Sequence, residues 1–287
     1  MLNILVAPSS YNADAEKITK SIVKFLKAEQ KDYSVFFSQS VDDMTKNMQQ
    51  LFEDGETDFV VVGDDFVLHK IINSTKDLSK IKLGIVPIGK NDDFANYLGI
   101  SQNPINAIKQ ILSGGVEKID YLMLNDMKVI NNIVLGASVE KQEIFSSFKI
   151  KNLLTEKIAE LKTAKNFSGV SLTLEMKQKQ KDNFFEMIIA NAGMSKGKMI
   201  SPLSNLKDGL FNLCYSTLNN KAEKQKFLSN LKQGKHIYND NTKQFWLTNL
   251  KITGETENIK ALADGELFQD HSFEISIVEG GLNIMKG

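Results

Sequence analysis

Pairs of aspartates follow two successive apolar runs of the sequence, and paired carboxylates can bind a divalent cation. Asp64 and Asp65 come directly after "DFVVVG", and Asp92 and Asp93 follow "KLGIVPIGKN". Clustered carboxylates repel one another unless a cation lies among them, and Mg²⁺ that carries a nucleotide is their usual occupant. Each acid could instead begin a helix, where it would cap backbone N–H groups and favour the helix dipole. Both interpretations are open at this point.

Three other stretches invite a chemical interpretation. "ADGELF" contains Asp264 and Glu266, but alone it reads as a tight Asp-Gly hairpin. "GIVPIGKN" has the glycine and lysine spacing of a Walker A loop, yet Asn91 stands where the metal-binding Ser or Thr belongs. Its middle is typical of a strand, so we reject that interpretation. Cys214 lies in the apolar run "LFNLCYST" and is expected to be buried and unreactive.

The elements that would position the acid pairs alternate between strand and helix over roughly the first 120 residues. Strands are predicted at "NILVAP", "YSVFF", "DFVVV" and "KLGIVP", with helical spacing of apolar residues between them. Asn103 and Pro104 should begin a helix that reaches Leu112 and ends at Gly114. This alternation predicts a parallel sheet with helices packed on it. Since ligands bind beyond the carboxyl ends of such strands, the two acid pairs should surround one crevice.

The remainder of the chain favours a second, mostly antiparallel β domain. "VSLTLEM", "FFEMIIANAG", "GLFNLCYSTL" and "QFWLTNLKITG" are long strand-like runs. Two helical patches interrupt them, around 153–161 and 222–231. We predict an α/β domain over 1–122 and a β-rich domain over 123–287. The last strand either stays in the second domain or returns to the first.

Composition narrows the classes of function. The chain has 287 residues, 42% of them hydrophobic, and no formal net charge, so a general attraction to nucleic acid is not indicated. It has no arginine, and its single cysteine excludes an intramolecular disulfide. "MLNILVAPSS" lacks a basic leader, and no apolar run approaches the roughly 18 residues of a membrane helix. These features predict a soluble, cytoplasmic protein.

Five motifs, in order, resemble the diacylglycerol kinase catalytic-domain family, which includes bacterial lipid kinases and sphingosine kinases. "DFVVVGDDFVLHKIIN" is similar to the family's "DLVVVGGDGTLNEVVN", and "KLGIVPIGKNDDFANYLGI" to its "LGIIPLGTxNDFARxLGI". "EKID" is similar to the "xxID" that closes the family's first domain. "SPLSNLKDGLFNLCY" resembles "APxAxLDDGLFDL", and "LADGELF" resembles "LDGE". The resemblance covers nearly the whole chain.

The resemblance implies an NAD-kinase-like α/β nucleotide domain, a β-sandwich-like second domain, and a site in the cleft between them. ATP would transfer its γ-phosphate to a lipid hydroxyl, with Asp264 as general base and Glu266 beside it. Asp64, Asp93 and Asp120 match the acids that arrange Mg²⁺. Asp208, with the backbone at Asn205 and Leu210, matches a structural metal site. The positions that would contact the nucleotide are Ser9, Gly63, Asp64, Asp65, Gly89, Lys90 and Asp93.

The sequence also departs from the family pattern. Val62, Asp65 and Phe66 replace two glycines and a threonine of the first motif, and Lys90 replaces a threonine of the second. Each lost glycine adds a side chain where phosphate oxygens approach the main chain, and Asp65 adds negative charge there. We hypothesise that Lys90 either pairs with Asp65, filling the phosphate site with an ion pair, or contacts the phosphates itself. Two unrelated surface substitutions are an equal alternative.

The sequence therefore predicts an ATP- and Mg²⁺-dependent lipid kinase homologue that visits the membrane surface. The alternative is a catalytically impaired pseudokinase, or lipid-binding protein, with the same fold. A third and weaker reading is phosphoryl transfer to a soluble alcohol or to NAD. The expected partners are a nucleotide and a lipid, with no nucleic acid, and a homodimer is left open.

Overall fold

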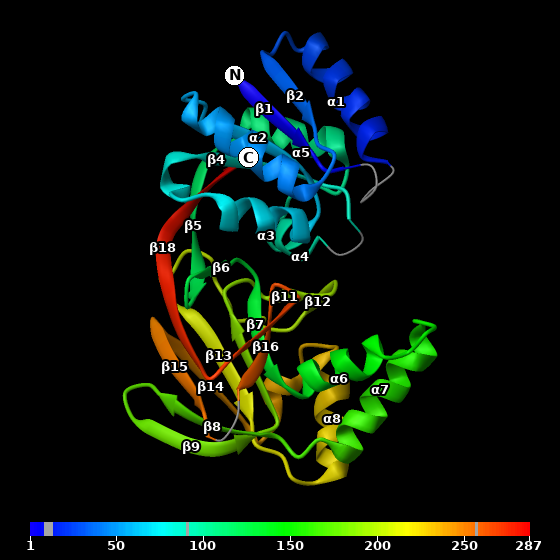
Figure 1. Cartoon of the computed structure of the whole chain (residues 1–287), viewed down its shortest axis with the longest axis vertical. Coiled ribbons are helices and arrows are strands. Elements are labelled where there is room, and N and C mark those ends of the chain that lie inside the picture. The colour runs from blue at the N-terminus through cyan, green and yellow to red at the C-terminus, as the bar shows by residue number, and fades with distance from the viewer. Residues whose placement is uncertain (9–13, 90–91, 256–257) are drawn as a thin grey trace. The chain divides into compact units, whose positions relative to one another are not determined.

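The chain divides into two compact units in a computed structural model that describes residues 1–8, 14–89, 92–255 and 258–287. Unit 1 comprises Met1–Tyr121 and Val278–Gly287, and unit 2 comprises Leu122–Ile277. Figure 1 labels the elements of both units. Within the described part of the chain, no helix is both long and apolar enough to cross a lipid bilayer.

Unit 1 is built on a parallel sheet, as the alternation of apolar runs predicts. Its strands lie in the order β2-β1-β3-β4, and the C-terminal part of β18 pairs in parallel with β4. The β-branched run Val60–Val62 is fully buried, which is typical of a parallel strand covered on both faces. The strands are β1 (Leu2–Val6), β2 (Tyr33–Phe37), β3 (Asp58–Gly63), β4 (Lys82–Pro87) and β5 (Gly115–Leu124), which continues into unit 2.

The helices of unit 1 pack on this sheet in two groups, α1 with α5 and α2 with α3. The predicted start of α5 is confirmed. Pro104 is its first residue, the Asn103 side chain accepts the N–H groups of Ile105 and Asn106 at 3.0 and 3.1 Å, and Gly114 follows its last residue. The helices are α1 (Ala15–Ala28), α2 (Val41–Glu53), α3 (Asp65–Ser74), α4 (Asp93–Tyr97) and α5 (Pro104–Ser113), with a 3₁₀ turn at Leu78–Lys80.

Unit 2 is a β-sandwich-like domain, which confirms the predicted class. One sheet has the order β14-β13-β10-β7-β16-β17, and a second is formed by β18, β15, β8 and β9. Apolar side chains from both sheets form one buried core, for example Leu213 and Ile189 from the first and Ile252 from the second. Three helices, α6, α7 and α8, gather at one side of this unit (Figure 1).

Two features of unit 2 differ from the sequence prediction. "QFWLTNLKITG" is not one strand, because the chain leaves one sheet after Leu247 and enters the other at Asn249. Helix α6 was not predicted at all. The elements are β6 (Met127–Val129), β7 (Asn132–Gly136), α6 (Ala137–Ser146), α7 (Leu153–Asn166), β8 (Val170–Glu175), β9 (Lys179–Phe184), β10 (Glu186–Ala190), β11 (Met194–Ser195), β12 (Lys198–Met199), β13 (Phe211–Ser216), α8 (Lys221–Leu231), a 3₁₀ turn (His236–Tyr238), β14 (Thr242–Leu247), β15 (Asn249–Gly254), β16 (Ile259–Ala263), β17 (Glu266–Asp270) and β18 (Ser272–Lys286).

Candidate active site

The two acid-bearing turns of unit 1 adjoin each other. β3 and β4 are neighbouring parallel strands, and the last residues of each, Gly63 and Pro87, are partners in the register. The N–H of Ile88 also donates to the carbonyl of Gly63 at 3.3 Å. The carboxyl ends of the strands therefore bring both acid pairs to one edge of the sheet, which is where parallel sheets bind ligands.

Asp64 and Asp65 each accept a backbone N–H group from the first turn of a different helix. Asp64 is the N-cap of α3, and its Oδ1 accepts the N–H of Val67 at 3.1 Å. The carboxylate of Asp65 crosses to the second turn and accepts the N–H of Phe94, in the first turn of α4, at 3.0 and 3.4 Å. Capping explains why acids stand at these positions, and the Asp65 contact ties the two turns together.

Asp92 is a buried acid that lies in the second of the two turns. Its two carboxylate oxygens lie 3.2 and 3.0 Å from the N–H of Gly89. Burial raises the pKa of Asp92 to about 6; the N–H of Gly89 opposes the shift, and the charges of Asp64 and Asp93 add to it. The charges of Asp64 and Asp93 therefore lie close enough to Asp92 to disfavour its ionised form.

Gly89 has no room for a side chain. A Cβ built on it would lie 2.6 Å from the Cβ of Asp64 and 2.6 Å from the Oδ1 of Asp92. The backbone of this turn is therefore packed directly between the two acids. Gly89 was expected here from its place in the motif, and Asp92 from its pairing with Asp93, although the family resemblance gave Asp92 no role.

The three acids predicted to arrange Mg²⁺ do not form a ready-made cage. Asp93 is buried at the start of α4. Asp120, on β5, is only 1% exposed, and its Oδ1 accepts the N–H of Gly280 on β18 at 2.7 Å. Across the ranges that the structure describes, no three His, Cys, Asp or Glu side chains are grouped so as to hold a metal ion. Mg²⁺ commonly takes only one or two protein carboxylates and completes its shell with phosphates and water.

Asp264 lies in unit 2, in the tight turn between β16 and β17. The predicted Asp-Gly hairpin is confirmed: Ala263 pairs with Glu266, and Asp264 and Gly265 have φ of 47° and 86°. The Asp264 carboxylate accepts the N–H groups of Ile130, Asn131 and Asn132 at 2.9, 2.8 and 3.3 Å. These donors fix the orientation of a half-buried carboxylate, with Glu266 half-buried at the start of β17.

The remaining candidates are placed as follows. Asp208 is exposed, and its Oδ1 accepts the N–H of Leu210 at 3.0 Å, in the loop before β13. Asn205 accepts the N–H of Lys207 at 3.1 Å in the same loop. Ser9 and Lys90 lie outside the described residues, as does the hypothesised Lys90–Asp65 pair.

Glu186 is a buried carboxylate that the sequence analysis missed. It is fully buried on β10 and accepts the backbone N–H of Ser138 at 2.8 Å and the Ser138 hydroxyl, at the start of α6. Burial raises its pKa to about 7, against the effect of these hydrogen bonds and of Lys141. Cys214 lies in the same unit and is buried as expected, and burial together with the charge of Glu186 raises its pKa to about 12. A lone glutamate inside the apolar run "FFEMIIANAG" was the available signal.

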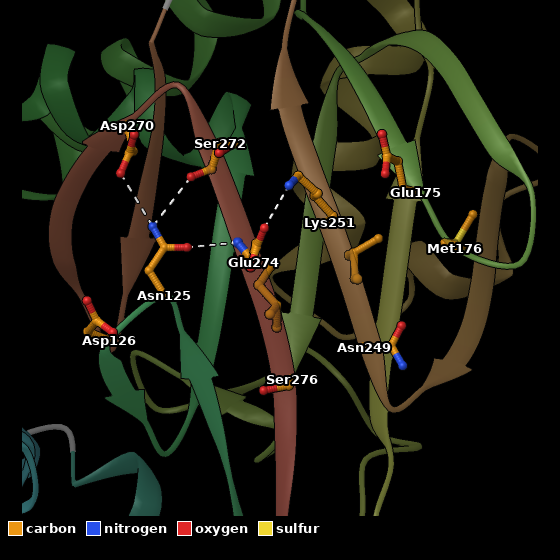
Figure 2. A pocket seen from close by; sticks show the side chains of 12 residues that line it. Asn125, Asp126, Glu175, Met176, Asn249, Lys251, Asp270, Ser272, Glu274 and Ser276 are labelled. Atoms are coloured by element: carbon orange, nitrogen blue, oxygen red, sulfur yellow. Dashed lines mark hydrogen bonds and ion pairs between the residues drawn. The ribbon is translucent and has the colours of Figure 1, made fainter.

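A hollow of about 770 Å³ also opens in unit 2, and none of the predicted site residues lines it. Figure 2 shows hydrogen bonds and an ion pair among some of its polar residues. Asn125 donates to Asp270 and to the carbonyl of Ser272, both at 3.4 Å, and accepts the N–H of Glu274 at 2.8 Å. Lys251 pairs with Glu274 at 2.7 Å. Its geometry does not link it to the acids described above.

Comparison with known proteins gives the family. Residues 1–124 match the diacylglycerol kinase catalytic domain, and residues 133–286, more than half of the chain, match the YegS C-terminal NAD kinase beta sandwich-like domain. The chain is 25% identical to a diacylglycerol kinase of Bacillus subtilis over 214 residues, which span 72% of this chain and 70% of that protein. A diacylglycerol kinase of Staphylococcus carnosus is 22% identical over 210 residues, 71% and 68% of the two chains.

A solved structure agrees in fold. The crystal structure of a diacylglycerol kinase from Bacillus anthracis superposes with a TM-score of 0.77 at 17% identity, covering 100% of this chain and 96% of that one. At this identity the likeness establishes the fold alone. The two domain matches together show that the chain belongs to the diacylglycerol kinase catalytic-domain family.

Proposed function

We propose that this protein is an ATP-dependent lipid kinase, which transfers the γ-phosphate of ATP to the hydroxyl group of a diacylglycerol-like lipid at a membrane surface. Family membership supports the class of reaction. The observation that carries the assignment to this site is the crowding of Asp64, Asp92 and Asp93 at the ends of adjacent strands. A cation relieves that repulsion, and phosphoryl transfer needs a cation to neutralise phosphate charge.

The carboxylate oxygens of this cluster fit Mg²⁺, which prefers hard oxygen ligands. We propose that Asp64 and Asp93 would hold the ion, with Asp120 as a further acid of unit 1. When bound, Mg²⁺ neutralises the charge that develops on the transferred phosphoryl group. Gly63 and Gly89 allow close approach of the backbone.

Asp264 is proposed as the general base. The lipid hydroxyl oxygen forms a bond to the γ-phosphorus, the bond from phosphorus to the β–γ bridging oxygen breaks, and ADP leaves with that electron pair. The hydroxyl proton passes to Asp264. The three N–H groups that hold this carboxylate keep it oriented, and positioning is a large part of what phosphoryl transfer requires. Glu266 stands beside it, and the loop of Asn205, Asp208 and Leu210 is proposed to hold a structural metal away from the chemistry.

Turnover can be tested by transfer of radiolabel from γ-labelled ATP to a panel of acceptors. The panel includes dioctanoylglycerol in mixed micelles, a sphingoid base, glycerol and NAD. We expect labelled phospholipid from the first acceptor, and none with the Asp64→Asn variant. Label on glycerol or NAD alone would instead support the soluble-acceptor alternative, and no label on any acceptor would contradict the proposal.

A second candidate, a lipid-binding member with an impaired nucleotide site, has its own supporting observation. Two backbone N–H groups of the second turn, those of Gly89 and Phe94, are already bonded to the protein's own carboxylates, Asp92 and Asp65. Backbone N–H groups at such a turn are what a phosphate would use. The Asp65 carboxylate therefore occupies the N–H of Phe94, which a phosphate could otherwise use, and it also adds negative charge to this turn.

The Asp65→Gly variant separates the two candidates. If Asp65 blocks the site, its removal frees the N–H of Phe94 and lowers the dissociation constant of Mg-ATP by at least about ten-fold, measured by calorimetry. Unchanged affinity in Asp65→Gly, with clear binding by the unaltered protein, would rule out self-occlusion. The Asp126→Gly variant removes an exposed acid of unit 2 and serves as the charge-matched control.

A further inference from the structure

Large aliphatic side chains are exposed together where α6 connects to α7. Ile150, Leu153 and Leu154 are 70%, 85% and 67% exposed, within five consecutive positions. Every residue from 149 to 154 is exposed, and we call this segment the α7 tip. Figure 1 shows the connection at the outer end of the α6–α7 pair. Single exposed leucines are ordinary, but a contiguous group marks an interaction site.

The exposure follows from how α7 is built. A capping box between Asn152 and Thr155 fixes Leu153 and Leu154 in the first turn of the helix. The helix packs through small residues instead, since Ala159 and Thr163 are fully buried. α7 therefore turns a side other than its leucines toward α6 and α8.

Exposed residues along one face of α7 extend the α7 tip, and we call this face the stripe. Leu154, Lys157, Leu161 and Lys165 follow the spacing of one helix face, i, i+3, i+7 and i+11. Leu161 is 48% exposed, and both lysines are exposed. In sequence, this stripe is typical of a solvated helix face, because sequence alone does not show which residues pack inward.

The acids of α7 form ion pairs with neighbouring elements, whereas several of its lysines and those of the tip are exposed. The two acids of α7 are engaged by neighbouring elements: Glu156 pairs with Lys141 at 3.4 Å, and Glu160 pairs with Lys232. No Asp or Glu occurs between Ser146 and Glu156. The outward cations are Lys149, Lys151, Lys157 and Lys165.

We propose that the α7 tip and its stripe dock unit 2 on an anionic phospholipid bilayer. Aliphatic side chains enter the boundary of the acyl chains, while lysine stems lie along it and their ammonium groups reach the lipid phosphates. An anionic surface attracts each such lysine. Exposed leucines among cations, with the acids of the helix paired elsewhere, fit this partner better than a neutral protein surface. This inference rests on the proposed function, because a lipid kinase must reach an acceptor that lies in a bilayer.

Vesicle binding tests the surface without any requirement for turnover. The whole protein is mixed, without nucleotide, with vesicles of phosphatidylcholine containing one-fifth phosphatidylglycerol, and bound protein is measured by sedimentation. Lys149→Gln with Lys151→Gln should weaken the partition coefficient about twenty-five-fold, since each lysine near an anionic surface contributes about five-fold. Ile150→Ser with Leu153→Ser should weaken it at least about ten-fold. Pure phosphatidylcholine vesicles should bind weakly.

Matched controls exclude a general charge or hydrophobicity effect. Lys221→Gln with Lys226→Gln removes the same charge from exposed positions of α8, and Tyr238→Ser removes a side chain that is 78% exposed. Both should bind vesicles like the unaltered protein. Equal losses in the controls and the tip variants would overturn the proposal, as would no binding of the unaltered protein. A dimer in sedimentation velocity that Leu153→Ser dissociates would overturn it too, because a second copy would then cover the tip.

Mg-ATP titration of the same samples separates this proposal from the proposed function. Tip variants that lose vesicles but keep nucleotide affinity support the docking surface and leave the kinase site intact. A protein that binds vesicles through the tip yet binds no nucleotide would support docking and contradict the kinase assignment. Loss of nucleotide binding in the tip variants themselves would overturn docking as an independent role, because the changes would then act through the fold.

Discussion

The carboxylates of the two units are held in opposite ways. In unit 1, Asp64, Asp92 and Asp93 crowd together, and the pKa of Asp92 rises to about 6 through burial and through the other two charges. In unit 2, Asp264 accepts three backbone N–H groups. Crowded acids need a cation to relieve their repulsion, whereas an acid bonded to N–H groups is already compensated. The difference suggests a cation-binding role for the first region and a fixed base in the second.

The largest expected effect comes from Asp264. Asp264→Asn should lower turnover on the lipid acceptor by about 10²–10⁴-fold, the usual contribution of a general base. Its affinity for Mg-ATP should not change, because the proposed base does not hold the cation. Steady-state kinetics and calorimetry measure the two quantities. A parallel loss of nucleotide affinity would show that the two regions do not have separate roles.

Asp270→Asn is the matched control for that prediction. Asp270 is an exposed acid on β17, the strand that follows Asp264 in the hairpin. It should leave both turnover and affinity near their original values. Thermal unfolding of Asp264→Asn shows whether the loss of turnover reflects a disturbed hairpin instead.

Glu186 sharpens the comparison, because it is a fully buried acid that accepts one N–H group and the hydroxyl of Ser138. Its pKa rises from an ordinary value of 4.5 to about 7 in the folded protein. The protonated form is thus favoured by folding, and stability declines as pH rises from about 4.5 to about 7. Glu186→Gln, which mimics the neutral acid, should raise the free energy of unfolding by about 3 kcal/mol at pH 8.

Urea denaturation at pH 4.5 and pH 8 checks this prediction. The gain should shrink toward zero at the lower pH, where Glu186 is protonated in the folded protein. Glu274→Gln changes an exposed acid and should alter stability by less than about 1 kcal/mol. A variant that is less stable than the unaltered protein at pH 8 would mean that the charged form is the one that folding favours.

The smallest effect concerns packing among the crowded acids. Gly89→Ala should lower the free energy of unfolding by about 1–3 kcal/mol, because its Cβ would lie 2.6 Å from both Asp64 and Asp92. Gly115→Ala is the control, since a Cβ there meets nothing within 4 Å. Equal stability of the two variants would mean that the acids of unit 1 have room to separate.

The sequence predicted the meeting of the acid turns because it depends on a simple rule. Apolar runs before each acid pair predict parallel strands, and neighbouring parallel strands end at the same edge. The contact from Asp65 to Phe94 could not be predicted in this way. It joins residues of different turns, and only the tertiary packing decides which way that side chain points.

Local signals also failed where they were weak. The N-cap of α6 is Gly136, which provides no side-chain cap, and "ASVEKQEIFS" has no clear apolar stripe. The change of sheet at Thr248 has no glycine or proline to mark it. A lone glutamate in an apolar run could mark Glu186 as buried, but it gives no hint of the Ser138 donors that reach it from another element.

The most direct test of the cation role is a calorimetric titration of Mg-ATP at pH 6, in two buffers of different ionisation enthalpy. Burial and the neighbouring charges raise the pKa of Asp92 to about 6, so a cation bound beside it would favour the charged form and release protons near this pH. We predict binding that releases protons and that disappears in Asp64→Ala but not in Asp126→Ala. No binding at millimolar Mg-ATP, or binding that persists in Asp64→Ala without proton release, would contradict a cation held by the crowded acids of unit 1.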